Sequence, residues 1–211
     1  MPKRNHARRV AWRSLLPWTL LLAASPALAA DPAQPDPASV SALIHDWPKP
    51  AQDAAQAMMR KYGPPQEATS TLLIWQGNSP WTRTLVRKTP VEHDFPVKHM
   101  DVLDQVVQYR VPLNFFSPLA TFDGSLVADR TRGEITASGD SEATNILALN
   151  LADDIIRGRK TVDQAREAMA AAARDMEAGK TPDDAETLHL PPPQGDLADP
   201  DTSVVATPGK G

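Results

Sequence analysis

The chain has 211 residues, no cysteine and a formal net charge of −4. The absence of cysteine excludes disulfide bonds, thiolate zinc sites and a lipid attached through a cysteine. The acidic balance argues against nucleic acid and anionic membrane surfaces as partners, because both need a basic protein surface.

The first 29 residues have the features of a secretory signal peptide. A basic opening without acids precedes the apolar segment Leu15–Ala30, which contains the A-x-A cleavage site Ala27-Leu28-Ala29. This segment is shorter than the roughly 20 residues that span a bilayer, so we expect no membrane anchor in the mature chain. Arg8 and Arg9 leave the twin-arginine export route open, but the residues after them fit that signal poorly. The pattern predicts a periplasmic or secreted protein.

Proline and acid density divide the rest of the chain. Residues 30–46 and 180–211 are rich in proline, and the second segment is also acidic. Neither buries enough apolar surface to offset the entropy of ordering. Residues 47–179 have enough aliphatic and aromatic residues for one domain. We therefore expect a Pro-rich linker, a single domain and a disordered acidic tail.

The domain begins with a predicted helix and hairpin. Apolar residues recur at helical spacing over residues 50–62, and Gly63-Pro64-Pro65 stops the pattern. Two β-rich runs, residues 72–76 and 81–86, flank the turn formers at 77–80. Such an arrangement is typical of a β-hairpin.

A loop, a strand and a short helix are predicted next. Pro90 and Pro96 mark the loop, and β-branched residues in 103–111 favour a third strand. A helix starting near Asp101 is the alternative. Residues 117–124 contain a Ser-Pro start and a glycine stop, which indicate a short helix.

The last part of the domain predicts a second hairpin and two helices. The hairpin strands are residues 125–131 and 134–138. A broadly apolar helix capped by Asp140 runs to Gly158, and a capping box of Thr161 and Gln164 starts the final helix. This order predicts an α+β domain with an antiparallel sheet, made of two hairpins plus one strand, that helices cover on one side.

Short motifs through the domain carry a resemblance to known proteins. They are Lys61-Tyr62-Gly63-Pro64-Pro65, Leu73-Ile74-Trp75, Pro80-Trp81, His93-Asp94-Phe95-Pro96, His99 to Val102, Tyr109-Arg110-Val111-Pro112, Asp123-Gly124-Ser125, Arg130 to Glu134 and Ala148 to Ile155. Over about residues 47–170 the pattern resembles a family of exported bacterial proteins without an assigned activity. The first helix and the tryptophan hairpin also resemble small outer-membrane-assembly lipoproteins, whose lipid-bearing cysteine this chain lacks. The second resemblance implies a role in envelope assembly.

The strongest chemical cluster in the sequence is His93, His99 and Asp101, with Asp94 and Asp104 nearby. Imidazole and carboxylate groups on one segment can bind zinc or another divalent ion. The spacing matches no recognised metal motif. The structural alternative is a loop whose histidines pair with carbonyls or with the neighbouring aspartates.

Two further groups are candidate binding surfaces. Arg83, Arg130 and Arg132 form a candidate anion site, although charges on a hairpin are more often solvated cross-strand pairs. Trp75 and Trp81 flank the first turn and form a candidate aromatic surface, although paired tryptophans are more often core residues.

These observations favour binding over catalysis. The sequence has no nucleophile elbow, phosphate-binding glycine loop, dinucleotide fingerprint or S-x-x-K motif. We expect a periplasmic binding or envelope-interaction module whose partner is a small molecule or an envelope protein. The alternative is a metal-assisted hydrolase that uses His93, His99 and Asp101. A divalent metal is the one cofactor that the residues suggest.

Overall fold

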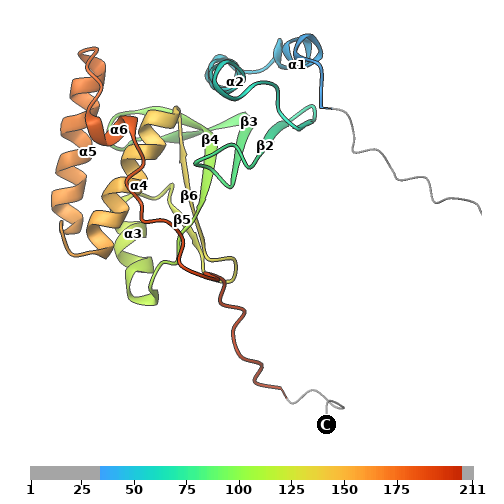
Figure 1. The fold of residues 1–211 in the computed structure, drawn as a ribbon. Helices are drawn as coiled ribbons and strands as arrows, with labels where there is room; N and C mark the ends of the chain where they lie inside the picture. Colours follow the sequence, from blue (N-terminus) through green and yellow to red (C-terminus); the bar gives the residue numbers. More distant parts are fainter. Residues whose placement is uncertain (1–33, 206–211) are drawn as a thin grey trace, which may run out of the picture. The chain divides into compact units, whose positions relative to one another are not determined.

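The computed structural model describes residues 34–205 (Figure 1), so the predicted signal peptide lies outside the described residues. Its helices are α1 (Pro37–Ile44), α2 (Lys49–Tyr62), a 3-10 turn η1 (Leu113–Phe115), α3 (Phe116–Phe122), α4 (Glu142–Ile156), α5 (Val162–Glu177) and α6 (Asp183–Glu186). Its strands are β1 (Glu67–Ala68), β2 (Leu72–Gln76), β3 (Arg83–His93), β4 (His99–Gln108), β5 (Val127–Asp129) and β6 (Glu134–Gly139). The strands form one antiparallel sheet in the order β1-β2-β3-β4-β6-β5. The α+β prediction is confirmed.

The helix ends follow the local sequence signals. Gly63 ends α2 with a φ of 78°, a conformation that glycine adopts without a steric cost. Thr161 and Gln164 form the predicted capping box of α5. The N-cap of α4 is Ser141 rather than Asp140, since the Ser141 side chain accepts the backbone N–H of Thr144.

Both β3 and β4 extend into the region between them, beyond the bounds predicted for these strands. β3 continues through Pro90 to His93, where a loop was expected, and β4 begins at His99. A register shift between Val86 and Val91 accommodates the proline, because a bulge leaves residues outside the hydrogen-bonded ladder. The alternative of a helix near Asp101 is wrong.

All the helices that pack on the sheet cover the same face. Leu73, Val86 and Leu103 are register partners and pack in one apolar cluster with α1 and α2. Val107 and Ile135 are also register partners and pack in a second cluster with α3, α4 and α5. Side chains two residues apart on a strand share a face, so both clusters lie on one side of the sheet, as Figure 1 shows. The opposite side has no helix on it among residues 34–205.

A buried polar network lies between the two apolar clusters. Its centre is the Glu142 carboxylate in the first turn of α4, of which the side chain is 11% exposed. Oε1 accepts hydrogen bonds from Tyr62 Oη at 2.5 Å, Trp81 Nε1 at 2.6 Å and Gln105 Nε2 at 3.2 Å. Asn145 in turn donates to the side chain of Gln105 at 3.1 Å. The network joins α2, the start of β3, β4 and α4.

The segment before the domain differs from the flexible linker expected over residues 30–46. Residues 37–44 form α1, which Asp36 caps through the backbone N–H of Ser39. Val40 and Ile44 are buried beside Trp47 in the cluster that contains α2. The prolines precede this helix or occupy its first turn, where a missing N–H costs nothing.

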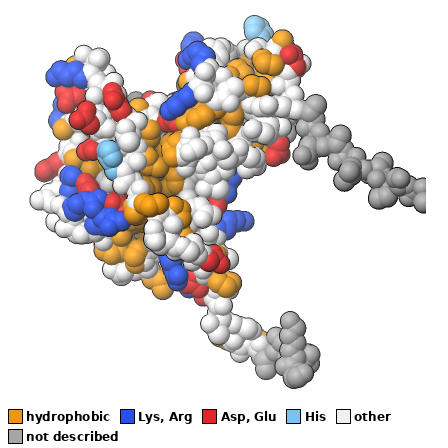
Figure 2. All heavy atoms as spheres, viewed as in Figure 1, with side chains coloured by type: hydrophobic (Ala, Val, Ile, Leu, Met, Phe, Trp, Pro, Cys, Tyr) orange, Lys and Arg blue, Asp and Glu red, His pale blue; other side chains and the backbone are white. Residues whose placement is uncertain are grey.

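The segment after the domain differs in the same way from the disordered tail expected from residue 180. Asn150 of α4 donates to the carbonyls of Asp184 and Thr187 and accepts the N–H of His189, all at 2.8 Å. Further along the chain, Leu197 packs against Gly133, and a Cβ atom on residue 133 would collide with the backbone of Leu197. Apolar side chains line this path on the face drawn in Figure 2. Residues 206–211 lie outside the described residues.

Candidate functional site

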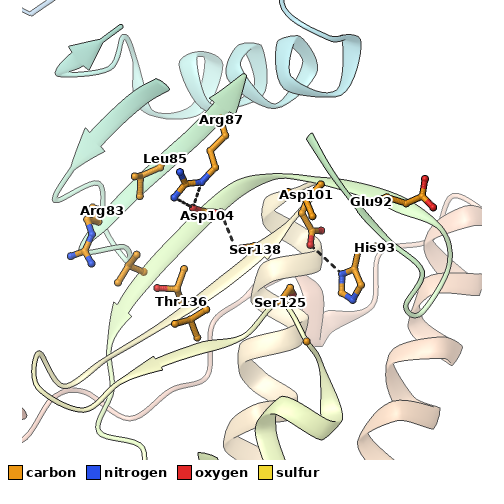
Figure 3. A pocket seen from close by; sticks show the side chains of 14 residues that line it. Arg83, Leu85, Arg87, Glu92, His93, Asp101, Asp104, Ser125, Thr136 and Ser138 are labelled. Carbon is orange, nitrogen blue, oxygen red and sulfur yellow. Dashed lines mark hydrogen bonds and ion pairs between the residues drawn. The ribbon is translucent and has the colours of Figure 1, made fainter. Parts of the chain in front are cut away.

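A hollow of about 750 Å³ lies on the uncovered face of the sheet (Figure 3). We call it the open-face groove. Its lining comes from β3, β4, β5, β6 and the α3–β5 turn and comprises Arg83, Leu85, Arg87, Val91, Glu92, His93, Asp101, Asp104, Val106, Gly124, Ser125, Val127, Thr136 and Ser138. Val91 and Val127 are more than half exposed. The groove therefore presents apolar, hydroxyl and charged groups together.

Two ion pairs cross the floor of the groove: one reaches from β3 across β4 to β6, and the other joins β3 to its neighbour β4. Arg83 makes a bidentate pair with Glu134, with N···O distances of 3.0 and 2.7 Å. Arg87 Nε donates to Asp104 Oδ2 at 2.7 Å, and Ser138 Oγ donates to the other oxygen of Asp104 at 2.8 Å. Positions four apart on a strand share a face, which is why both arginines point into the groove.

The predicted metal candidates come together at one end of this groove. His93 and His99 are direct partners across the β3–β4 ladder, and Asp101 follows His99 by two residues. Both relations place side chains on the same face of a strand pair. Asp101 Oδ2 is 3.2 Å from His93 Nδ1, and Oδ1 is 2.9 Å from His99 Nε2. The three side chains are 10–17% exposed. They lie on strands rather than on the predicted loop.

The second nitrogen of each ring also faces an oxygen. His99 Nδ1 is 2.9 Å from the Val97 carbonyl, and His93 Nε2 is 3.7 Å from Asp123 Oδ1. The neighbouring Asp101 carboxylate raises the pKa of His99 to about 9 despite the opposing effect of burial. His93 Nδ1 and Asp101 Oδ1 are buried without a well-formed hydrogen bond. The cluster therefore holds polar atoms that protein groups do not satisfy.

The candidate anion site is not assembled. Arg83 pairs with Glu134, Arg132 pairs with Asp129, and Arg130 pairs with Asp199 and Asp201 of the C-terminal segment. Each arginine thus has its own carboxylate partner, and no two share one. Of these pairs, only Arg83–Glu134 joins two strands, whereas Arg132 pairs within its own turn and Arg130 with the C-terminal segment. Asp199 and Asp201 lie far away in sequence, so their roles had no local signal.

The candidate aromatic surface is wrong. Trp75 and Trp81 are 1% and 2% exposed, because alternation along β2 turns Trp75 towards the helices and Trp81 packs in the α4 cluster. Their indole N–H groups are satisfied inside the domain, by the Gly63 carbonyl for Trp75 and by Glu142 for Trp81. Both tryptophans are core residues, the alternative that the sequence had favoured.

Two residues of the site have no clear signal in the sequence. Asp123 faces His93 from the end of α3, where it also accepts hydrogen bonds from the N–H and Oγ of Ser125 at 2.8 and 2.7 Å. Its Asp-Gly-Ser context indicates a turn and not a neighbour of His93. Arg87 faces the groove because β3 extends beyond residue 86, where the predicted strand ended.

Comparisons with protein-family models, with curated proteins and with solved structures find no match for this chain. In residues 34–205, no helix has both the length and the apolar character needed to cross a membrane. The groove and the cluster at its end are the structural features that bear on function.

Proposed function

We propose that this protein is an exported binding module that holds a small amphipathic ligand in the open-face groove. The observation that carries the proposal is the hollow on the one side of the sheet that no helix of the described chain covers. Its volume of about 750 Å³ is within the range of about 300–1,000 Å³ that small-molecule sites occupy.

The lining supports a ligand with both apolar and acceptor groups. Leu85 and Val91 on β3 and Val127 on β5 offer apolar contacts at separate points of the lining. A guanidinium has five N–H donors, and the ion pairs of Arg83 and Arg87 each use two of them. The remaining donors are available to carbonyl, hydroxyl or carboxylate oxygens of a ligand. Because both arginines are already held by carboxylates, the groove is preorganised for this contact.

The groove is tested with the amphipathic anion 1-anilinonaphthalene-8-sulfonate, whose fluorescence rises in apolar sites. Thr136 lies in the groove, so Thr136→Trp should fill it and abolish a saturable signal of the wild type. Gln56→Trp is the matched control, since Gln56 is exposed on α2, and should bind as the wild type does. Absence of saturable binding, or equal binding by both variants, would overturn the proposal.

Export is tested separately. Mass spectrometry of the protein from its native host should find an N-terminus at Ala30, since cleavage is expected after Ala27-Leu28-Ala29. An intact N-terminus on protein from the cytoplasm would remove the export part of the proposal and leave the groove part standing.

A further inference from the structure

We propose that His93, His99 and Asp101 form a binding site for one divalent transition-metal ion, of the kind represented by zinc. This site deepens the proposed function, since it lies at one end of the open-face groove, and His93 and Asp101 belong to the groove lining. The metal site depends only on its own three residues, so it can be tested separately from ligand binding in the groove.

The ligand atoms are already close to the spacing that a metal ion needs. One atom from each side chain can be chosen so that all lie within 4.8 Å of one another. Around a tetrahedral ion with bonds of about 2.0–2.1 Å, neighbouring ligand atoms are about 3.3 Å apart. The contact of His93 Nδ1 with Asp101 Oδ2, at 3.2 Å, and that of His99 Nε2 with Asp101 Oδ1, at 2.9 Å, are both slightly shorter than this value. Small side-chain rotations therefore suffice to place an ion between them.

The strands fix the ligands before any metal arrives. His93 and His99 are held by direct pairing across the ladder, and Asp101 is held one pleat further along the same strand as His99. The β4 residues before Leu103 have no partner in β6, so the cluster lies where β3 and β4 extend past the rest of the sheet. Ligands on paired strands lose little freedom when a metal binds, which favours affinity.

The outer nitrogens of the histidines have the partners that metal-bound imidazoles use. A ligating histidine generally donates its other N–H to a carbonyl or a carboxylate, which fixes the tautomer. His99 Nδ1 has the Val97 carbonyl at 2.9 Å, so Nε2 is left to bind a metal. His93 Nε2 faces the buried Asp123 carboxylate at 3.7 Å, which Ser125 orients. Each ring therefore has one nitrogen facing an acceptor outside the cluster and the other facing Asp101, on the side where a metal would bind.

The donor set selects the class of metal. Two imidazoles and one carboxylate suit zinc and similar transition metals, whereas calcium and magnesium prefer oxygen ligands. Three protein ligands leave a tetrahedral ion one further position, for water or for an oxygen of a molecule in the groove. The buried atoms without well-formed hydrogen bonds, His93 Nδ1 and Asp101 Oδ1, would both gain a partner in the metal.

The experiment uses tag-free protein, stripped with a chelator, and zinc ions alone as the probe. Calorimetric titration near pH 7.5 should find one zinc per chain. His99→Ala and Asp101→Asn should each weaken zinc binding by at least about tenfold, a loss typical of damaged metal sites. His45→Ala is the matched control, because His45 is exposed at the end of α1, and should leave the affinity unchanged.

A second measurement needs no variant and so does not depend on how the variants fold. Diethyl pyrocarbonate modifies accessible imidazoles, and mass spectrometry locates the modified rings. Zinc should protect His93 and His99 and leave His45 and His189 reactive. No stoichiometric zinc binding by the wild type, or zinc binding without this protection, would overturn the metal site. Either result would leave the groove test unaffected.

Discussion

Removal of the Glu142 carboxylate should be among the most damaging single changes in this domain. In Glu142→Ala, the buried donors Tyr62 Oη, Trp81 Nε1 and Gln105 Nε2 lose their shared acceptor. Trp81 Nε1 keeps Tyr62 Oη at 3.2 Å, so about two donors remain without a partner. At about 1–3 kcal/mol for each unsatisfied buried donor, the expected loss is about 2–6 kcal/mol of unfolding free energy.

Two variants separate this effect from the loss of charge. Glu142→Gln keeps an acceptor oxygen of the same reach and should cost about 1–2 kcal/mol, the difference between a charge-assisted and a neutral hydrogen bond. Lys61→Met removes the remaining partner of the carboxylate, but Lys61 is 53% exposed. An exposed ion pair contributes about 0–1 kcal/mol, so this variant should be nearly as stable as the wild type.

Urea unfolding, followed by circular dichroism and by tryptophan fluorescence, measures all three variants. The expected order of stability is Lys61→Met, then Glu142→Gln, then Glu142→Ala. If Glu142→Ala unfolds within about 1 kcal/mol of the wild type, the network between the two apolar clusters does not have the energetic role that its geometry implies.

Two further predictions concern the same fold. Asn150→Ala should release the segment after α6 and cost about 2–3 kcal/mol, since it removes three hydrogen bonds to backbone groups. Amide hydrogen exchange in residues 184–189 should rise, while the exposed control Asn114→Ala leaves it unchanged. Acid should also destabilise the protein. Burial tends to raise the pKa of Glu142, but hydrogen bonds from Lys61, Tyr62 and Trp81 hold it below its usual 4.5. The stabilisation by the Glu142 carboxylate is therefore present above pH 4.5 and is lost as the pH falls through the lowered pKa. The urea midpoint of Glu142→Gln should therefore fall less between pH 6 and pH 3 than that of the wild type, and parallel curves would contradict this assignment.

Local signals in the sequence were sufficient for most of the elements. Helical spacing and the Gly-Pro stop place α2, and the Thr161–Gln164 capping box places α5, because both signals act within a few residues. The cover of the sheet on one side was predicted from the order of the helices and strands along the chain. The β3 extension was missed because Pro90 argues against a strand unless a bulge removes it from the ladder, and a bulge leaves no local pattern.

The candidate site was only partly predictable for a related reason. The two histidines and Asp101 are close in sequence, so any hairpin brings them near one another. Asp123, which faces His93, comes from a helix end on another part of the chain, and only the tertiary fold places it there. The order in residues 184–189 was missed for the same reason. Their composition predicted disorder, but the backbone of this segment is held by hydrogen bonds to Asn150, and composition gives no information on such a partner.

The short strands at the two ends of the sheet limit how other proteins can attach. β1 has two residues and β5 has three, so neither edge offers a long ladder for a foreign strand. The main-chain groups of β2 on the β1 side also have hydrogen-bond partners next to β1. Thr69 binds the N–H and carbonyl of Leu72, and Gln66 binds the carbonyl of Ile74 and the N–H of Gln76. At these two ends of the sheet, strand addition, which drives both edge-to-edge aggregation and many peptide complexes, is therefore restricted. A protein partner would then contact side chains on the uncovered face of the sheet and not main-chain groups at these two edges.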